Sequence, residues 1–479
     1  MSSQPFRTAS QPGERILAIN PGSTSTKVAL YEGEIEVFSE TVEHPRDELA
    51  AFPTVIAQYA YRRAAVDALL AGHGMADMPL AAVAGRGGLL PPMPGGAWRI
   101  TPAMLETLEQ ARYGEHPCNL GAPLAHDYAA RWGVAAYIVD PPVTDEMDEV
   151  ARISGLPALP RRSVFHALSQ RSAARRAAEL LGVDYAANRW LVAHMGGGIS
   201  VAAHRCGRIV DVINALDGDG PIAPERTGRL PSLGVLSLVQ DGTYTFEQLR
   251  RIILREGGMW AHCGTNDLRV LERRMDGTSR CDKDGTSCCG GDGTSRCDKD
   301  GTPRCDKDGT PRCDKDGTSC CGGDGTSRCD KDGTPRCDKD GTPRCDKDGT
   351  SRCDKDGTAT SGTDGEGGTP PDAHAALVFE AVAYTVAKEI ASLAPALLDG
   401  GSGTGCGEPV ADAAACPPRI AGVVLTGGMA RSARLTERLR QRLQWLAPVV
   451  VLPEVEEMHA LASGVLRVLR GQETPGDYI

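Results

Sequence analysis

The pattern of apolar and polar positions along the chain predicts strands that alternate with helices. Short apolar runs that end at glycine, proline or a polar turn are typical of buried strands, and apolar residues three or four positions apart are typical of amphipathic helices. The predicted strands cover residues 16–19, 28–31, 35–40, 80–84, 135–139, 190–193, 199–203 and 420–424, and the predicted helices cover 54–71, 102–112, 163–181, 267–275 and 375–398. This order predicts an α/β fold with mixed sheets.

A repetitive tract from Asp276 to about Thr369 interrupts the apolar pattern. It repeats the octad Cys-Asp-Lys-Asp-Gly-Thr-Ser/Pro-Arg, which contains no Leu, Ile, Val or aromatic residue. Such a segment cannot bury enough apolar area to offset the entropy lost on ordering. We therefore expect a disordered low-complexity insert in a helix–helix connection, where added length costs little stability.

Two other interpretations of the tract stay open. Asp-Lys-Asp-Gly resembles half of a calcium loop, although the distal Glu and the third acidic ligand of an EF-hand are missing. The pairs Cys288-Cys289 and Cys320-Cys321 suggest thiolate binding of a soft metal, but an eight-residue spacing is not a Cys-x-x-Cys site. A change in circular dichroism or radius of gyration on adding calcium or zinc would distinguish these interpretations.

The remaining sequence is long enough for two domains. Residues 1–13 are expected to form a flexible tail, and a glycine-rich segment at 399–418 forms a smaller insert. Without this segment and the tract, about 365 residues remain. We expect an N-terminal lobe at 14–150, against which residues 459–479 return, and a C-terminal lobe at 151–458 that contains the tract.

Composition and charge narrow the class of protein. The chain has 479 residues and a net charge of −11, which disfavours nucleic acid as a partner. No apolar run has the length of a signal peptide core or a membrane span, so we expect a cytoplasmic protein that does not enter a membrane. Of 17 cysteines, 12 lie in the tract, and the scarcity elsewhere fits a reducing compartment.

Four segments rich in glycine and hydroxyl residues lie beside predicted strands. Backbone N–H and hydroxyl groups in such turns can surround a phosphate, and four of them favour a nucleotide cleft between two related halves. A P-loop is disfavoured because Gly-x-x-x-x-Gly-Lys-Ser/Thr is missing from the sequence. The segments are Asn20-Pro-Gly-Ser-Thr-Ser-Thr-Lys27, His194-Met-Gly-Gly-Gly-Ile-Ser200, Pro224-Glu-Arg-Thr-Gly228 and Leu425-Thr-Gly-Gly-Met429.

Several of these segments resemble the acetate and butyrate kinase family, within the actin-like and sugar-kinase superfamily. The first segment resembles one family signature, and Val164-Phe-His-Ala-Leu168 after Arg161-Arg162 resembles another. The segments at 86–90, 115–122, 139–147, 194–200 and 214–221 resemble the butyrate kinase branch. The resemblance implies a two-lobed actin-like ATPase (ribonuclease H-like) fold, ATP and Mg²⁺ as cofactors, a homodimer, and reversible in-line phosphorylation of butyrate to butyryl phosphate.

Phosphoryl transfer to a carboxylate brings two anions together, so the site needs fixed positive charge. Arginine binds carboxylate and phosphate through two bonds, and Arg86 and Arg226 lie in glycine-containing loops. The resemblance implies that one arginine holds the acid, that both stabilise the transferred group, and that His166 hydrogen-bonds it. Asp140, at the end of a strand, suits a role linked to magnesium. The ordinary alternative for each arginine is a surface ion pair, and for His166 it is a role as a helix-capping or core histidine.

The resemblance also implies the nucleotide and metal contacts. Asn20 would contact phosphate or the metal, and Glu456 would supply the second metal ligand, in preference to Glu457. Acidic residues are favoured at the start of a helix in any case, so the alternative for both glutamates is a solvated helix start without a metal. The expected nucleotide-binding residues are Asn20, Ser23, Ser25, Lys27, Gly196, Gly197, Gly198, Gly427 and Gly428.

Three alternative functions stay open at this point. The substrate could be another short or branched acid, such as acetate, propionate or isobutyrate, since each methylene is worth only about 1 kcal/mol in an apolar pocket. A sugar kinase would need a base to deprotonate a hydroxyl, whereas a carboxylate is already ionised. The non-enzymatic alternative is an actin-like ATPase scaffold with a metal-binding repeat.

Overall fold

The computed structural model describes residues 13–75, 78–214, 216, 218–277, 371–398, 419–453 and 457–479. These residues belong to two compact units. One unit combines residues up to 262 with residues from 381 onward, and the other spans 263–380. The flexible tail predicted at 1–13, most of the tract and the insert at 399–418 lie outside the described residues, so these three predictions stay untested.

The larger unit contains a seven-stranded mixed sheet in the order β12-β5-β6-β4-β1-β2-β3. β1 pairs with β2 in antiparallel and with β4 in parallel register, so the turn after β1 and the end of β4 meet at one edge of the sheet. The strands are β1 (Arg15–Pro21), β2 (Ser25–Glu32), β3 (Ile35–Glu43), β4 (Ala82–Gly85), β5 (Ala97–Arg99), β6 (Ala135–Val139) and β12 (Gly476–Asp477).

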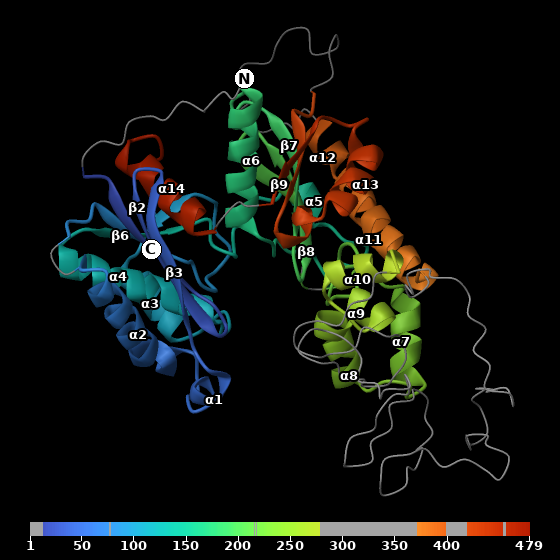
Figure 1. Ribbon diagram of the computed structural model, residues 1–479, viewed down its shortest axis with the longest axis horizontal. Helices are drawn as coiled ribbons and strands as arrows, with labels where there is room; N and C mark the ends of the chain where they lie inside the picture. Colours follow the sequence, from blue (N-terminus) through green and yellow to red (C-terminus); the bar gives the residue numbers. More distant parts are fainter. Residues whose placement is uncertain are drawn as a thin grey trace, which may run out of the picture. The chain divides into compact units, whose positions relative to one another are not determined.

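Both faces of this sheet are covered by helices (Figure 1). On one face α14 (Glu457–Leu469) packs with its buried side chains against β1, β2 and β4. On the other face α2 (Tyr59–Gly72) and α4 (Gly121–Trp132) cover the alternate side chains of the same strands. Strands buried on both faces read as continuous apolar runs, which is why the sequence identifies them without alternation.

A second, five-stranded sheet in the same unit has the order β11-β10-β7-β8-β9. α6 (Ala167–Leu181) packs its alanines against β7 and β10 around the fully buried Trp190. The strands are β7 (Arg189–Met195), β8 (Ile199–Arg205), β9 (Arg208–Ile213), β10 (Gly422–Thr426) and β11 (Val449–Leu452). β7 and β8 form a hairpin whose turn is the triple-glycine segment, and β10 lies parallel to β7.

The remaining helices connect or flank the sheets. α1 (Arg46–Leu49), α3 (Pro102–Glu109) and α5 (Glu149–Arg152) are short, as are α7 (Ser232–Gln240), α8 (Phe246–Arg251), α9 (Met259–Cys263) and α12 (Ala394–Leu398). α13 (Ala433–Leu443) follows β10. Irregular turns of helix lie at Ile56–Gln58, Pro117–Leu120, Ile252–Glu256 and Gly428–Arg431.

In the smaller unit, α10 (Leu268–Met275) and the start of α11 (Ala373–Ser392) flank the repetitive tract. The Arg274 guanidinium lies 2.9 and 2.5 Å from the Asp372 carboxylate, and the Asp372 N–H donates to the Arg274 carbonyl at 2.9 Å. The two chain ends that border the tract are therefore joined directly to each other.

Two predicted helices differ from those observed. The helix predicted from residue 163 begins at Ala167, because His166 has φ −89° and ψ 63°, outside the helical region. The helix predicted at 375–398 is two helices, α11 and α12. The break lies at Leu393, because Pro395 has no N–H to donate to the preceding turn of helix and its ring clashes with the carbonyl of residue 391.

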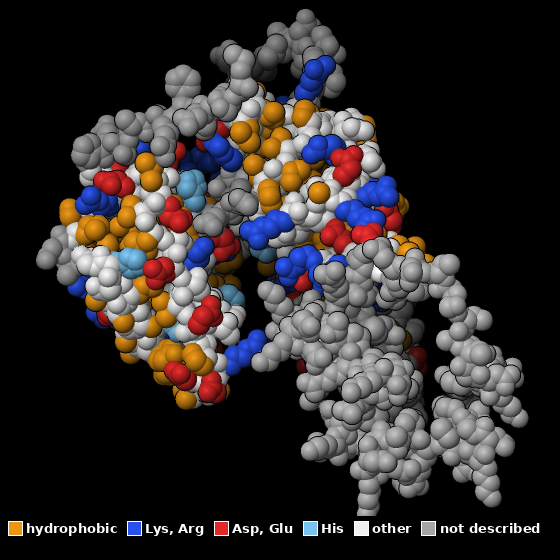
Figure 2. Space-filling model, in the orientation of Figure 1, with side chains coloured by type: hydrophobic (Ala, Val, Ile, Leu, Met, Phe, Trp, Pro, Cys, Tyr) orange, Lys and Arg blue, Asp and Glu red, His pale blue; other side chains and the backbone are white. Residues whose placement is uncertain are grey.

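The segment 373–398 is the one candidate membrane span among the described residues, by length and composition alone. Half of its most apolar window is buried inside the protein, which is typical of a core helix in a soluble protein. On the face shown in Figure 2, basic and acidic side chains of the described residues are interspersed.

Candidate active site

The turn between β1 and β2 carries the first of the four glycine-containing segments. Asn20 lies near the end of β1 opposite Lys27 of β2, and the turn closes with the Gly22 N–H donating to the Ser25 carbonyl at 2.7 Å. Ser23 and Gly22 complete this turn, which leaves its hydroxyl and amide groups at the edge of the sheet.

Arg62 of α2 braces this turn from behind. Its side chain is fully buried, and its guanidinium donates to the carbonyl oxygens of Gly22 at 2.8 Å, Ser25 at 3.0 Å and Ser23 at 3.2 Å. Gln58 accepts from the other edge of the guanidinium at 3.0 Å. Sequence reasoning missed Arg62, although an arginine on the apolar face of an amphipathic helix is a detectable signal.

Glu457, the first residue of α14, lies between two predicted site residues. Its carboxylate accepts from Asn20 Nδ2 at 2.8 Å and lies 3.1 Å from Arg86 Nη1. The charge of Arg86 holds the pKa of Glu457 below its usual range, with the Asn20 hydrogen bond acting in the same direction against burial. Glu457 is therefore ionised at neutral pH and partly exposed, with 37% of its side chain accessible.

Glycines let the backbone around Arg86 pack closely at the end of β4. A Cβ on Gly121 would lie 2.3 Å from the Arg86 carbonyl oxygen, and a Cβ on Gly85 would lie 2.4 Å from the Gly121 carbonyl oxygen. The Arg86 N–H continues the sheet by donating to Ile19 at 2.9 Å. Arg86 is thus fixed by its backbone, and 13% of its side chain is accessible.

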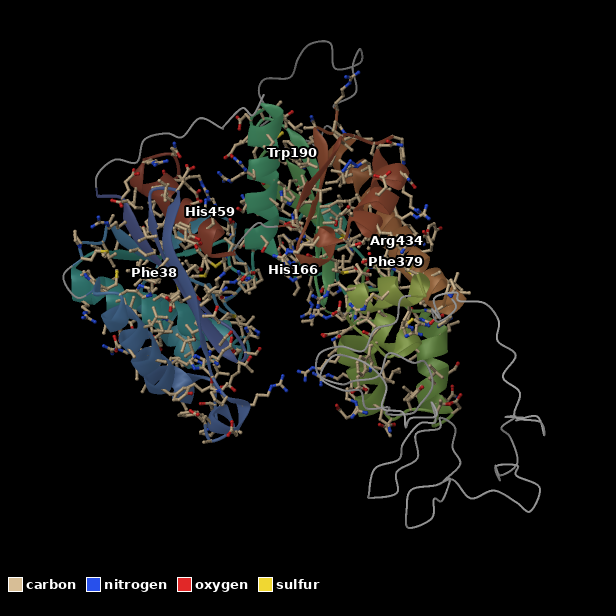
Figure 3. The ribbon with its side chains drawn as sticks, in the orientation of Figure 1. Phe38, His166, Trp190, Phe379, Arg434 and His459 are labelled. Carbon is tan, nitrogen blue, oxygen red and sulfur yellow. The ribbon has the colours of Figure 1, made fainter. Side chains whose placement is uncertain are left out.

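His166 lies immediately before α6, at the end of that helix where Figure 3 labels it. Its ring stacks on that of His194 with centroids 4.1 Å apart and an interplanar angle of 18°. Its Nδ1 lies 2.8 Å from Ser200 Oγ. Burial, His194 and the two arginines Arg86 and Arg226 lower the pKa of His166 well below 6.5, so its ring is neutral at pH 7.

The triple-glycine turn lies against Arg226. A Cβ on Gly198 would be 2.0 Å from Arg226 Nη1, and a Cβ on Gly197 would be 3.5 Å from Glu225 Oε2. The Glu225 N–H also donates to the Gly197 carbonyl at 3.4 Å. The second and third glycine-containing segments are therefore in direct contact, and a side chain at position 198 would displace the guanidinium of Arg226.

These contacts bring several of the predicted residues to one place. Arg86 and Arg226 both act electrostatically on His166, and Ser169 of α6 lies 3.5 Å from Glu457, which also binds Asn20. Fixed positive charge, a neutral histidine, oxygen ligands and glycine backbone are thus assembled from segments that are distant in the sequence. Such an arrangement suits the handling of an anion whose charge is redistributed during transfer.

Asp140 lies in a different environment. It is 2% exposed, its Oδ1 accepts from the Gly96 N–H at 2.7 Å, and Arg171 Nε lies 3.1 Å from the same oxygen. Arg171 also donates to Glu146 Oε2 at 2.9 Å and to the Gly207 carbonyl at 2.9 Å. Its contacts give Asp140 a structural role, and the catalytic role predicted for it stays a prediction.

The fourth segment follows β10. Gly427 has φ +88°, and a Cβ there would lie 2.5 Å from the Met195 carbonyl oxygen, so Gly427 allows the ends of β10 and β7 to approach. A Cβ on Gly428 would meet no atom within 4 Å, which leaves open space beside it. Gly428 is thus exposed, whereas Gly427 has a packing reason of its own.

The metal ligand predicted at Glu456 lies outside the described residues. Its neighbour Glu457 is described, and with Asn20 it provides a partly exposed carboxylate and an amide. Within the described ranges, no group of three or more His, Cys, Asp or Glu side chains could hold a metal ion. One carboxylate and one amide fit Mg²⁺, which keeps several waters and shares substrate phosphates, better than a metal that requires a full protein cage.

Comparison with known proteins identifies the family. A model of the acetokinase family matches residues 158–284. A protein named "Probable butyrate kinase" from Oleidesulfovibrio alaskensis is 46% identical over 467 residues, which cover 97% of this chain and 98% of that protein. A "Probable butyrate kinase" from Listeria monocytogenes is 34% identical over 463 residues, covering 97% and 99%.

The chain belongs to the acetokinase family. The resemblance drawn from the sequence is thereby confirmed, and so is the prediction of an enzyme that transfers a phosphoryl group to a carboxyl group. The family uses ATP.

Solved structures support the same fold for this acetokinase family member. Porphyromonas gingivalis acetate kinase aligns with a TM-score of 0.59 at 16% identity, covering 95% of this chain and 100% of that one. A propionate kinase from Francisella tularensis aligns with a TM-score of 0.55 at 13% identity, covering 94% and 98%. The predicted actin-like ATPase fold with mixed sheets is confirmed.

Proposed function

We propose that this protein phosphorylates a short-chain carboxylate, with butyrate as the preferred acid, from ATP bound with magnesium. The observation that carries the proposal is the convergence of Arg86, Arg226, His166 and Glu457. The relatives named as probable butyrate kinases support butyrate as the substrate, together with the segments that resemble the butyrate kinase branch.

Arg86 and Arg226 would neutralise charge on the two anions. The Arg86 side chain is held at a strand end, and the guanidinium N–H groups that do not face Glu457 would bind the substrate. Arg226 packs on Gly198, where a nucleotide phosphate would lie against the glycine backbone. Fixed guanidinium groups stabilise the charge that develops in the transition state without having to reorganise, which is the main contribution expected from the protein.

His166 would donate a hydrogen bond to the transferred phosphoryl group. Its depressed pKa keeps the ring neutral beside two arginines, so it acts as a hydrogen-bond donor and not as an additional charge. Because a carboxylate is already ionised, the attacking oxygen needs no general base. This requirement separates the proposed reaction from that of a sugar kinase on a related fold.

Magnesium would be held by Glu457 and Asn20 together with water and phosphate oxygens. When bound, the ion would neutralise charge on the nucleotide phosphates. The proposal takes Glu457 as the metal-linked carboxylate because it contacts Asn20 and Arg86, whereas Glu456 lies outside the described residues. The residues of the chain that position it are Asn20, Arg86 and Ser169.

The nucleotide would lie along the glycine-containing turns. Ser23, Ser25 and Lys27 would contact phosphate at the turn that Arg62 braces, and Gly196, Gly197 and Gly198 would lie against the β- and γ-phosphates. The adenosine would pass Gly427 and Gly428, where the open space at Gly428 supports this placement.

We infer a cytoplasmic homodimer with an N-terminal lobe at 14–150 and a C-terminal lobe at 151–458. Large apolar side chains are exposed on α7 and α8. Leu233 and Leu236 of α7 are 79% and 63% exposed, and Phe246 of α8 is 67% exposed. Apolar exposure of this kind supports a protein partner, and a second copy would cover it symmetrically. Sedimentation of the protein at micromolar concentration, compared with the variant Leu233→Glu/Leu236→Glu, tests this inference.

An acyl-phosphate assay tests the proposed function. The full chain is incubated with ATP, Mg²⁺ and hydroxylamine together with acetate, propionate, butyrate, isobutyrate, glycerol or glucose. We expect acyl hydroxamate with the acids, the highest kcat/KM with butyrate, and no ADP release above background with glycerol or glucose. ADP release with a sugar and none with any acid would contradict the proposal.

A further inference from the structure

A row of buried polar side chains runs from His166 into the protein. Ser200, Gln170 and His204 are inaccessible to solvent, and Tyr185 is 6% exposed. Tyr185 Oη lies 3.1 Å from His204 Nδ1, and His204 Nε2 lies 3.4 Å from Gln170 Oε1. Gln170 Nε2 lies 2.8 Å from Ser200 Oγ, and Ser200 Oγ lies 2.8 Å from His166 Nδ1.

The backbone fixes the direction of these hydrogen bonds. The Ser200 carbonyl oxygen can only accept, and it lies 3.1 Å from the Gln170 side-chain amide, so the atom facing Ser200 must be Nε2. Gln170 Oε1 therefore faces His204 and requires a hydrogen on His204 Nε2. In a neutral imidazole the other nitrogen then accepts, so the Tyr185 hydroxyl donates to it at 3.1 Å in preference to the Gly207 carbonyl at 3.5 Å.

The same direction continues toward His166. Ser200 Oγ accepts a hydrogen bond from Gln170, and because this hydroxyl is fully buried, its single hydrogen is satisfied by donation to His166 Nδ1. A neutral His166 that accepts at Nδ1 carries its hydrogen on Nε2. The five groups thus donate in one direction, from Tyr185 to the nitrogen of His166 that remains available to a ligand.

We propose that this one-way chain fixes the Nε2–H tautomer of His166, which makes Ser200 and Gln170 positioning residues for phosphoryl transfer. The proposal rests on the proposed function, in which His166 donates to the transferred group. In the other tautomer, His166 would present a lone pair to an anion, and the hydrogen bond would become a repulsion.

The surroundings keep His166 and His204, the two histidines of this hydrogen-bond chain, neutral, as the arrangement requires. Burial, with the charge of Arg171 acting in the same direction, lowers the pKa of His204 well below 6.5. His166 stacks on His194 and lies near two arginines, so a proton on its ring would be repelled from three sides. The Ser200 hydroxyl and the Gln170 amide are inaccessible to solvent, so bulk water cannot replace a lost hydrogen-bond partner.

The test observes the tautomer directly in the protein without nucleotide or metal. ¹⁵N-labelled histidine gives well-separated resonances for protonated and unprotonated ring nitrogens, and His166→Gln assigns the signals of residue 166 among the ten histidines. We expect a protonated Nε2 and an unprotonated Nδ1 in the wild-type protein. In Ser200→Ala we expect loss of the single tautomer, and in Gln170→Met a smaller shift toward a mixture.

Kinetics provide the second measurement. We expect Ser200→Ala to lower kcat about tenfold or more, the scale of losing an outer partner that orients a functional histidine, with KM for the acid and ATP changed less than threefold. Ser163→Ala is the matched control, because it removes a buried hydroxyl that donates to the Thr144 carbonyl at 2.7 Å and has no contact with the chain. This control should retain both the tautomer and the kcat.

The outcomes separate this inference from the proposed function. A protonated Nδ1 in the wild-type protein, or an unchanged tautomer in folded Ser200→Ala, would overturn the inference while leaving the assay with butyrate unaffected. The expected tautomer in the wild-type protein, together with full turnover in His166→Ala, would instead show that His166 does not contact the transferred group. If Ser200→Ala does not fold, Gln170→Met carries the same measurement, and Ser200→Thr, which keeps the hydroxyl, should retain the single tautomer.

Discussion

Two clusters of arginines and carboxylates lie in the same unit and behave differently. Around Arg171, both Asp140 and Glu146 are within 3.1 Å, and the three side chains are 11% exposed or less. Around Arg86, Glu457 lies at 3.1 Å but is 37% exposed. The first cluster is closed and holds segments of the fold together, whereas the second is open to a ligand, although the residue types are the same.

Breaking the closed cluster should have the largest effect on stability. Burial opposes charge on Arg171, but Asp140 and Glu146 outweigh it and raise the pKa of the guanidinium further above its usual range. Arg171→Met would leave two buried carboxylates with backbone N–H donors but no cationic partner, which costs about 3 to 5 kcal/mol of unfolding free energy. Urea denaturation measures this, and Arg176→Met on the exposed face of α6 is the control.

Removing an arginine of the proposed active site, either Arg86 of the open cluster or Arg226, should lower turnover and leave stability nearly unchanged. We expect Arg86→Ala or Arg226→Ala to lower kcat by about a hundredfold or more, the scale of losing a preorganised charge donor. Steady-state kinetics with butyrate, beside denaturation curves of the same variants, measure both quantities. Near-normal turnover in both variants would refute the assignment of the open cluster as the active site.

Glu457→Gln should sharpen the comparison. The amide keeps the shape and a contact with Asn20 but removes the charge that pairs with Arg86 and would bind magnesium. We expect the Mg²⁺ concentration for half-maximal rate to rise about tenfold, the lower end for loss of one metal-linked group. A magnesium titration of kcat measures this, and an unchanged midpoint would return the role to Glu456.

The histidines beside both clusters predict how stability depends on pH. Burial lowers the pKa of His194 to about 4 and that of His204 well below 6.5. Between these values and 6.5 the unfolded chain binds protons that the folded chain does not, so stability is lost as pH falls below about 6.5. Each group contributes at most about 1.4 kcal/mol per pH unit, which chemical denaturation between pH 7 and 5 measures.

Removing the repetitive tract should have the smallest effect. Deletion of residues 277–370 with a short glycine linker leaves Arg274 and Asp372 in place, and we expect kcat and KM within about twofold of the wild-type values because loop length contributes little to stability. Loss of turnover in a folded deletion variant would show that the tract has a role in catalysis. Circular dichroism with calcium and zinc tests the metal-binding alternatives on the full chain.

Sequence reasoning identified the residues of the proposed active site better than the buried residues that hold them in place. Asn20, Arg86, His166 and Arg226 lie in short motifs at strand ends, where local patterns are informative. Arg62 escaped notice because it lies within a helix, where its buried contacts depend on the tertiary fold. Whether Glu456 or Glu457 faces the site also depends on the fold, since neighbouring residues at a helix start point about 100° apart.

Consecutive residues of α6 illustrate the same limit. Ser169 contacts Glu457, Gln170 contacts Ser200, and Arg171 contacts Asp140. In the sequence they form an unremarkable polar triplet within an alanine-rich helix. Only the packing of the helix among three neighbours gives each residue its separate role.

The direct pairing of Arg274 with Asp372 has a consequence for how this chain can change over time. Repeated DNA gains and loses units readily, and each gain or loss here adds or removes a whole octad. Because the two borders of the tract are tied to each other, the number of octads can drift without moving either neighbouring helix. The same junction offers a place to graft an unrelated domain onto the protein.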